Sequence, residues 1–282
     1  MKKTINLRLL IEYLQENANR RDILRLKAAM GDEKAKKELI DYFKGLQLPS
    51  GAFPYAFQKE KPGTIIDTYR AYQILKELKN GDKKNQVIEN IVGFLKQSQH
   101  KDGSWDEKDQ VLEIPDLPFW MDPRKKEVKI LTTAYAILIM VIELPSSLHT
   151  TKGLDFLQEH QRNDGTFPGF PHTTWIAGAA FLGYYGKSHH MGQRMVRVID
   201  GLIKKDHPGS VLQWIASSLI FAGYTPHSLT ILSRVLDKLK KMQQANGLWT
   251  AEDQDIELET AVNCLITLDM GEQINLTGED SS

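Results

Sequence analysis

Two kinds of helical pattern alternate along the chain. Runs of the first kind carry an apolar stripe against a charged face, as Ile88, Ile91 and Leu95 do in the run near residues 84–98. Runs of the second kind, such as residues 130–142 and 211–221, are apolar on nearly all sides. An amphipathic helix of the first kind has one solvent-exposed side, whereas a uniformly apolar helix must be buried on most sides. The alternation therefore predicts an outer and an inner layer of helices.

The pattern places five helices of each kind. The expected outer helices run near residues 33–46, 84–98, 147–161, 190–204 and 227–243. The expected inner helices run near residues 64–79, 126–142, 172–185, 209–223 and 255–269. Helical spacing of Ile5, Leu9 and Leu14, followed by a second run over residues 21–30, adds an N-terminal pair. Taken in order, these runs predict about six helical hairpins.

A short motif recurs after four of the outer runs. It consists of a glutamine, three residues, a glycine, one residue and an aromatic residue: Gln47/Gly51/Phe53, Gln99/Gly103/Trp105, Gln161/Gly165/Phe167 and Gln243/Gly247/Trp249. Glycine permits a turn with positive φ, the aromatic ring can pack under the adjacent repeat, and the glutamine amide can satisfy backbone groups at a helix end. A degenerate fifth copy is expected around His207, Pro208 and Gly209.

These repeats predict an all-α fold, an (α/α)6 toroid of about six hairpins. In such a ring each inner helix is covered by its neighbours and its outer partner, which leaves one face toward a central apolar cavity. An open superhelix of hairpins is the alternative. We expect residues 1–270 to form one toroid domain and residues 271–282 a polar, disordered C-terminal tail.

Composition narrows the functional classes. The 282 residues include 36 basic and 36 acidic side chains, so no strong global field favours nucleic-acid binding. The single cysteine, Cys264, excludes an internal disulfide and a thiolate-rich metal site. Residues 1–10 do not read as a secretory signal, and no apolar run reaches the roughly 18 residues of a membrane span. We expect a soluble, cytoplasmic protein.

Two of the repeats carry a resemblance to a known superfamily. Leu95, Gln99, Asp102, Gly103, Ser104 and Trp105, and in parallel Leu157, Gln161, Asp164, Gly165, Thr166 and Phe167, resemble the glutamine-tryptophan repeats of squalene-hopene and oxidosqualene cyclases. Protein prenyltransferase β subunits share a weaker form of this repeat. The resemblance spans roughly residues 33–269 and implies an apolar cavity for a prenyl or terpenoid substrate. It also raises the possibility of a partner subunit, as in the prenyltransferases.

The catalytic motifs of the resembled families are missing here. The sequence has no Asp-Asp pair, which removes both the Asp-x-Asp-Asp motif of alkene-protonating cyclases and the Asp-Asp-x-x-Asp magnesium motif. Cys264 has no Asp-x-Cys neighbour of the kind that holds zinc in prenyltransferases. We therefore expect no metal and no cofactor.

Asp67 and Glu257 are the candidate acids. When the inner helices are aligned on Ala71, Ala134, Ala177, Ala216 and Ala261, both acids fall at one position in the first turn. An apolar surrounding could keep such an acid protonated, ready to protonate an alkene or a leaving group. The alternative is that both are ordinary helix caps or dipole partners.

Residues near the same helix ends are candidates for substrate binding. They are Tyr69, Tyr72, Tyr135, His172, Trp175, Trp214 and Glu259. Aromatic faces could stabilise a carbocation, and core packing is the alternative. Trp120 is a further candidate, in the long apolar connection between residues 105 and 126, which is interpreted either as a substrate-contacting lid or as a proline-braced surface loop.

Three functions remain open. The leading one is a terpene-cyclase-like or prenyltransferase-like protein with an apolar ligand, and acid-initiated cyclisation as its reaction. The second is a non-catalytic toroid that serves as a binding or assembly module. The third is a glycoside hydrolase or polysaccharide lyase, in which Asp67 and Glu257 would form the carboxylate pair.

Overall fold

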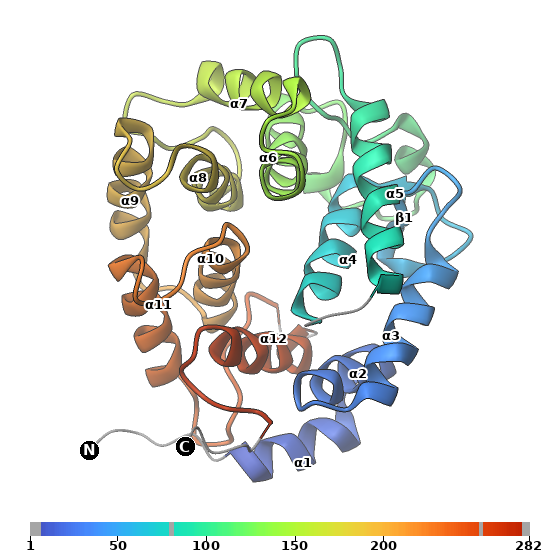
Figure 1. Ribbon diagram of the computed structural model, residues 1–282, viewed down its shortest axis with the longest axis vertical. Helices are drawn as coiled ribbons and strands as arrows, with labels where there is room; N and C mark the ends of the chain where they lie inside the picture. Colours follow the sequence, from blue (N-terminus) through green and yellow to red (C-terminus); the bar gives the residue numbers. More distant parts are fainter. Residues whose placement is uncertain (1–6, 79–81, 254–255, 278–282) are drawn as a thin grey trace. The chain divides into compact units, whose positions relative to one another are not determined.

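The chain folds as a series of helical hairpins (Figure 1). The computed structural model describes residues 7–78, 82–253 and 256–277. Within them the helices are α1 Leu7–Asn17, α2 Arg20–Ala29, α3 Glu33–Leu46, α4 Ile65–Glu77, α5 Asp82–Ser98, α6 Lys126–Glu143, α7 Leu148–His160, α8 Pro171–Tyr185, α9 His190–Ile203, α10 Gly209–Phe221, α11 Thr230–Lys241 and α12 Glu257–Met270. Every expected helix is present, with ends shifted by at most a few residues. The predicted all-α fold class is confirmed.

One small strand pair and three short 3₁₀ helices were not expected. Strands β1 Phe53–Pro54 and β2 Gly63–Thr64 pair antiparallel in the connection between α3 and α4. The 3₁₀ helices are η1 Tyr55–Phe57, η2 Asp109–Glu113 and η3 Phe119–Met121. They give regular structure to the two longest connections, which pattern analysis treats as loops.

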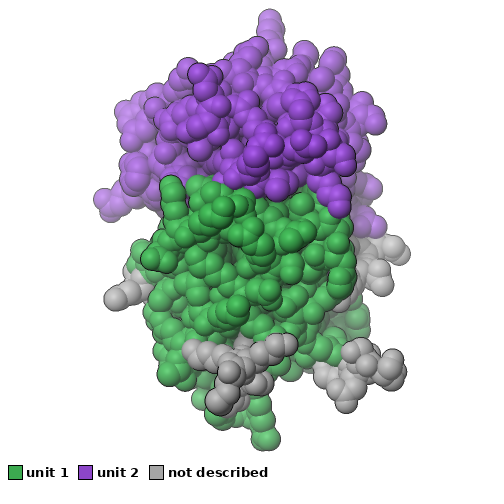
Figure 2. All heavy atoms as spheres, turned by 90° about the vertical axis from the view of Figure 1, so that its left-hand side faces the viewer, with its two compact units in different colours: residues 1–39, 200–282 green, residues 40–199 purple. Residues whose placement is uncertain are grey.

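The chain divides into two compact units (Figure 2). Unit 1 comprises Met1–Leu39 and Asp200–Ser282, and unit 2 comprises Ile40–Ile199. In unit 2, helix α6 contacts α4 and α8, so these three form an inner row, and α5 and α7 pack against it. The burial follows the sequence pattern, since α8 is buried without a break from Thr173 to Leu182.

Unit 1 is built around α12. This helix contacts α2 and α10, while α1 and α11 pack against it as well. Arg25 on α2 donates to Asn263 Oδ1 on α12 at 2.7 Å, and its Nη1 lies 3.2 Å from Asp22 Oδ1. The side chains of Asp22 and Arg25 are both buried, so they form an enclosed ion pair.

Each motif glutamine binds its own turn, and those of the first three motifs also reach the next outer helix: Gln47, Gln99 and Gln161. Gln99 Nε2 donates to Gly103 O at 3.0 Å and to His149 O, in the first turn of α7, at 2.9 Å. The other three glutamines donate to their motif glycines at 2.8 to 3.0 Å in the same way: Gln47, Gln161 and Gln243. The motif thus links consecutive repeats, and its glutamine amide donates hydrogen bonds to loop carbonyls as well as to a helix end.

The motif glycines hold positions that other residues would not fit. All four adopt left-handed φ angles of 87 to 90°: Gly51, Gly103, Gly165 and Gly247. A Cβ on Gly103 would lie 2.3 Å from the carbonyl oxygen of Lys152 on α7. The glycine therefore provides the turn and also lets the next outer helix approach closely.

A repeated threonine contact corrects the register of α6. The backbone N–H of the motif aromatic donates to a hydroxyl in the first turns of the following inner helix, pairing Phe53 with Thr68, Trp105 with Thr133 and Phe167 with Thr174. These threonines stand three residues before Ala71, Ala136 and Ala177. The sequence alignment on Ala134 was therefore wrong for this helix, and Ala136 is the counterpart of Ala71.

Part of the expected C-terminal tail lies within the described residues. Leu276 is buried, and its backbone N–H donates to Asp269 Oδ1 at 2.9 Å. Lys240 on α11 also donates to the carbonyl oxygen of Gln273, at 3.1 Å. Residues 271–277 thus pack back on α11 and α12, and residues 278–282 lie outside the described part.

Candidate functional site

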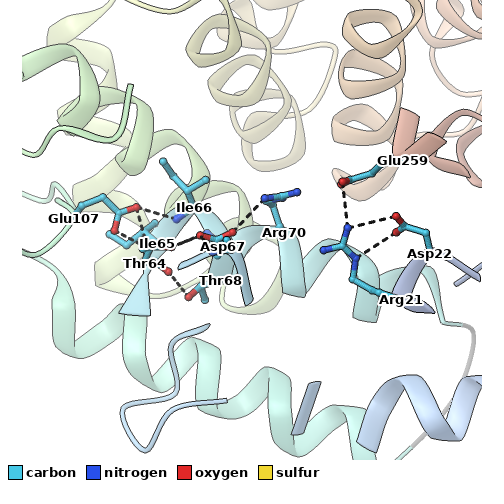
Figure 3. A network of polar contacts seen from close by, with 11 residues as sticks. Arg21, Asp22, Thr64, Ile65, Ile66, Asp67, Thr68, Arg70, Glu107 and Glu259 are labelled. Carbon is cyan, nitrogen blue, oxygen red and sulfur yellow. Dashed lines mark hydrogen bonds and ion pairs between the residues drawn. The ribbon is translucent and has the colours of Figure 1, made fainter. Parts of the chain in front are cut away.

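Asp67 lies buried in the first turn of α4, which is capped by Thr64 (Figure 3). Thr64 Oγ1 donates to Asp67 Oδ2 at 2.9 Å, and the Asp67 backbone N–H donates back to Thr64 Oγ1 at 3.0 Å. Arg70 Nη1 lies 3.3 Å from Asp67 Oδ1. Each carboxyl oxygen of Asp67 thus accepts from at least one donor.

Asp67 also holds a strained turn. The backbone N–H of Ala56 donates to Asp67 Oδ2 at 3.2 Å. Ala56 and the next residue, Phe57, have φ angles of 51° and 58°, in the left-handed region that side chains other than glycine rarely occupy. Two strained residues in succession must be held by their surroundings, and the Asp67 carboxylate supplies one of the bonds that hold them.

Glu107 is a second buried carboxyl group at the start of α4. Its Oε2 accepts from the Ile65 N–H at 2.8 Å, and its Oε1 accepts from the Ile66 N–H at 3.0 Å (Figure 3). Burial raises the pKa of Glu107 to about 8, although these two N–H groups favour the ionised form. Near neutral pH, Glu107 is therefore largely protonated, unlike an ordinary glutamate.

Aromatic side chains of α4 and α6 meet on the inner row of unit 2. The rings of Tyr69 and Tyr135 lie 4.5 Å apart between centroids. Tyr69 accepts from Gln73 Nε2 at 2.9 Å, and Tyr72 donates to Glu143 Oε1 at 2.5 Å. Burial raises the pKa of Tyr72 and of Tyr135, so both phenols stay neutral. Of the predicted substrate-binding residues, Tyr69 and Tyr72 thus share α4 with Asp67, and Tyr135 packs against Tyr69.

Tyr135 and His172 combine partial exposure with strong desolvation. Both side chains are partly accessible to solvent. Burial nevertheless raises the pKa of Tyr135 and lowers the pKa of His172 to about 4. Both side chains are therefore largely surrounded by protein, although part of each remains accessible to solvent.

His172 lies beside Trp175 on α8, at a ring distance of 4.9 Å. Trp175 is almost fully buried, and its indole Nε1 has no hydrogen-bond partner among the described residues. A buried indole N–H usually finds an acceptor, so this donor is an under-satisfied group in α8.

The remaining candidates fall in other places. Trp120 lies in η3, with about a third of its surface exposed. In unit 1, Glu257 is partly exposed in the first turn of α12, and Glu259 Oε2 accepts from Arg21 Nη2 at 3.2 Å (Figure 3). Trp214 is partly exposed on α10. Glu257, Glu259 and Trp214 thus belong to unit 1, whereas Asp67 belongs to unit 2.

Comparison with protein families gives one result that covers most of the chain. Residues 15–196 match the squalene-hopene cyclase C-terminal domain. The chain belongs to this family. A comparison with curated proteins found no match. Family membership confirms the resemblance carried by the glutamine-tryptophan repeats. The match begins in α1 and ends in α9, so it includes the N-terminal pair of helices but not residues 197–269 of the expected span.

Features of two other classes of protein, metal-binding and membrane-spanning, are not seen among the described residues of this cyclase-family chain. No group of three histidine, cysteine or acidic side chains among the described residues is placed to hold a metal ion. None of the helices within the described ranges combines the length and hydropathy that crossing a bilayer requires.

Sequence reasoning missed Glu107 and Arg70. Arg70 follows Asp67 by three residues, so the helical i,i+3 spacing could have indicated their ion pair. Glu107 follows the motif tryptophan by two residues, and a carboxyl group aimed at a helix N-terminus is a familiar cap. Its partners Ile65 and Ile66 lie about 40 residues earlier in the chain, so no local pattern indicated them.

Proposed function

We propose that the protein binds a prenyl or terpenoid chain on the inner face of α4, α6 and α8, as a terpene-cyclase-like protein. The observation that carries this proposal is the environment of Tyr135 and His172, which are solvent-accessible yet desolvated. A surface of this kind offers apolar contact to a hydrocarbon chain. Membership in a cyclase family supports the same class of ligand.

The aromatic rings suit the intermediates of such a reaction. Tyr135 presents a partly exposed phenol ring that packs on the buried Tyr69. On the neighbouring helix, the partly exposed His172 lies beside the buried Trp175. Faces of neutral aromatic rings attract cations through their quadrupole, so they would stabilise a passing carbocation. Acid-initiated cyclisation is the reaction we propose for this surface.

The bonds of Asp67 favour a second candidate function, which is binding without catalysis. An acid that starts a cyclisation must donate a proton to the substrate. Asp67 accepts from Thr64, Ala56 and Arg70 instead, so both of its carboxyl oxygens already act as acceptors within the protein.

Incubation of the full chain with squalene and with geranylgeranyl diphosphate, followed by product analysis, tests both functions. Formation of cyclised product above a no-protein control supports catalysis. A thermal shift with these lipids and no product supports binding alone. Tyr135→Ala should weaken the shift, while Tyr42→Ala, which removes an exposed tyrosine of α3, should leave it unchanged. No shift and no product would overturn the proposal.

A further inference from the structure

A cleft of about 610 Å³ opens in unit 2, away from the inner face just described. It is walled by the C-terminal part of α5, by Ser50 and Gly63 beside the small strand pair, by the first residue of α4 and by the segment that follows Trp105. Ile65, Phe94 and Pro123 supply apolar wall, and Asp106, Glu107 and Asp109 supply carboxyl groups. A volume of this size is typical of sites that hold small molecules.

Asp106 is the under-satisfied group of this cleft. Its Oδ2 lies 3.4 Å from both Lys129 Nζ and His100 Nε2. Its Oδ1 is buried and has no hydrogen-bond partner among the described residues. Burial raises the pKa of Asp106 even with Lys129 nearby, which shows that its charge is incompletely compensated. A buried oxygen of this kind is stabilised by any donor that reaches it.

The chemistry of the lining selects the type of donor. An ionised carboxylate can only accept hydrogen bonds, and a charged donor forms roughly twice as strong a bond as a neutral one. A ligand carboxylate would add another negative group beside Asp106 and Asp109. Of the two cationic or titratable side chains of the lining, Lys108 is exposed, and His100 lies beside Asp106 with about half of its side chain exposed.

We propose that this cleft binds a small organic cation, an ammonium group attached to an apolar body. The ammonium group donates to Asp106, whose terminal torsion is soft enough to turn one oxygen toward the ligand while the other keeps Lys129. The apolar body lies against Phe94 and Pro123. This site does not depend on the function proposed above, because its residues lie outside the prenyl-binding face.

Three probes of one skeleton separate charge from shape. Isothermal titration calorimetry of the full chain at pH 7 would use 2-phenylethylamine, 2-phenylethanol and 3-phenylpropanoate. We expect saturable binding of the amine, binding of the alcohol weaker by about tenfold or more, and no binding of the acid. Equal binding of the three probes, or no binding of the amine at millimolar concentration, would overturn the proposal.

A pair of variants locates the bound amine. Asp106→Asn should weaken amine binding by about tenfold or more, because it removes the charge that faces the cleft. Asp102→Asn removes the same charge from a residue that also contacts Lys129, at 3.2 Å, but does not line the cleft. It should leave the affinity within about threefold of the wild type. Equal losses in the two variants would show a diffuse charge effect and contradict the assignment.

Discussion

The backbone N–H of Ile65 lies 2.8 and 3.0 Å from the two carboxyl oxygens of Glu107, so a side chain of the long connection caps the first turn of α4. This contact ties the segment after Trp105 to the helix that carries Asp67. The contact joins two consecutive repeats through Glu107, a residue that lies in a connection and not in a helix. The carboxyl group is almost completely buried there, which makes its protonation state part of the stability of the fold.

We predict that stability falls as the pH rises through the range where Glu107 titrates. Its pKa is about 8 in the folded protein and near 4.5 in an unfolded chain. Between these values the folded state binds the proton and the unfolded state does not, so the contribution of Glu107 is complete below about pH 4.5 and is lost toward pH 8. The slope is at most about 1.4 kcal/mol per pH unit.

Urea unfolding of Glu107→Gln at several values between pH 5 and pH 8 checks this prediction. The amide keeps an acceptor for the N–H groups and cannot ionise, so the decline should be much smaller than in the wild type. Glu113→Gln, on the exposed side of the same connection, is the matched control and should keep the wild-type slope. A steep decline that persists in Glu107→Gln would show that another group is responsible.

The motif glycines should differ in their tolerance of alanine. Gly103 and Gly247 have nearly the same φ, 88° and 87°, so alanine costs about 1–2 kcal/mol of backbone strain at either site. At Gly103 the added Cβ also lies 2.3 Å from a backbone oxygen of α7, whereas at Gly247 the nearest atom is 3.6 Å away. Gly103→Ala should therefore lower the melting temperature clearly more than Gly247→Ala. Equal losses would mean that φ alone decides the cost.

The sequence allowed prediction of most of the fold because the repeats carry several signals at once. The spacing of hydrophobic residues, the motif glycine and the motif glutamine all mark the same helix ends. The helices could be predicted because these signals agree there. The register of α6 failed because small residues occur at both Ala134 and Ala136, and only the hydrogen bond from Trp105 to Thr133 distinguishes them. The position of an alanine alone does not specify which face of a uniformly apolar helix packs against which neighbour.

The candidate site was less predictable, since its key contacts join distant parts of the chain. The prediction that Asp67 lies in the first turn of an inner helix is correct. The hydrogen bond that Asp67 accepts from the Ala56 N–H depends on a left-handed turn at Ala56 and Phe57. Neither residue is a glycine, so the sequence gives no sign of this turn. The contact of Glu107 with Ile65 likewise needs the three-dimensional arrangement, because a backbone N–H leaves no signature in a sequence.

Removing one charge of the buried ion pair of unit 1 should lower the free energy of unfolding strongly, whereas replacing both charged residues should lower it much less. Asp22→Asn leaves Arg25 charged and enclosed, for which we expect a loss of about 3 kcal/mol or more in the free energy of unfolding. Asp22→Asn combined with Arg25→Met removes both charges and should recover a large part of that loss. Chemical denaturation of the two variants measures the difference.

A surface pair provides the reference for this comparison. Arg8 and Glu12 form an ion pair at 3.0 Å with both side chains largely exposed. Arg8→Ala should change stability by no more than about 0.5 kcal/mol. A double variant of the buried pair that is less stable than Asp22→Asn would show that the pair adds net stability, against the expectation.

The turn held by Asp67 yields the last prediction. Ala56 adopts φ 51°, a conformation that costs a residue with a Cβ about 1–2 kcal/mol and costs glycine almost nothing. Glycine loses more entropy on folding, so Ala56→Gly should stabilise the protein by a net amount of about 0.5–1 kcal/mol. Ala222→Gly is the matched control, because Ala222 ends α10 at φ −70° and gains no relief from glycine. Thermal unfolding should show a rise for the first variant and none for the second. A fall in both would mean that Ala56 carries no strain, and the bond from its N–H to Asp67 would then be an ordinary turn contact.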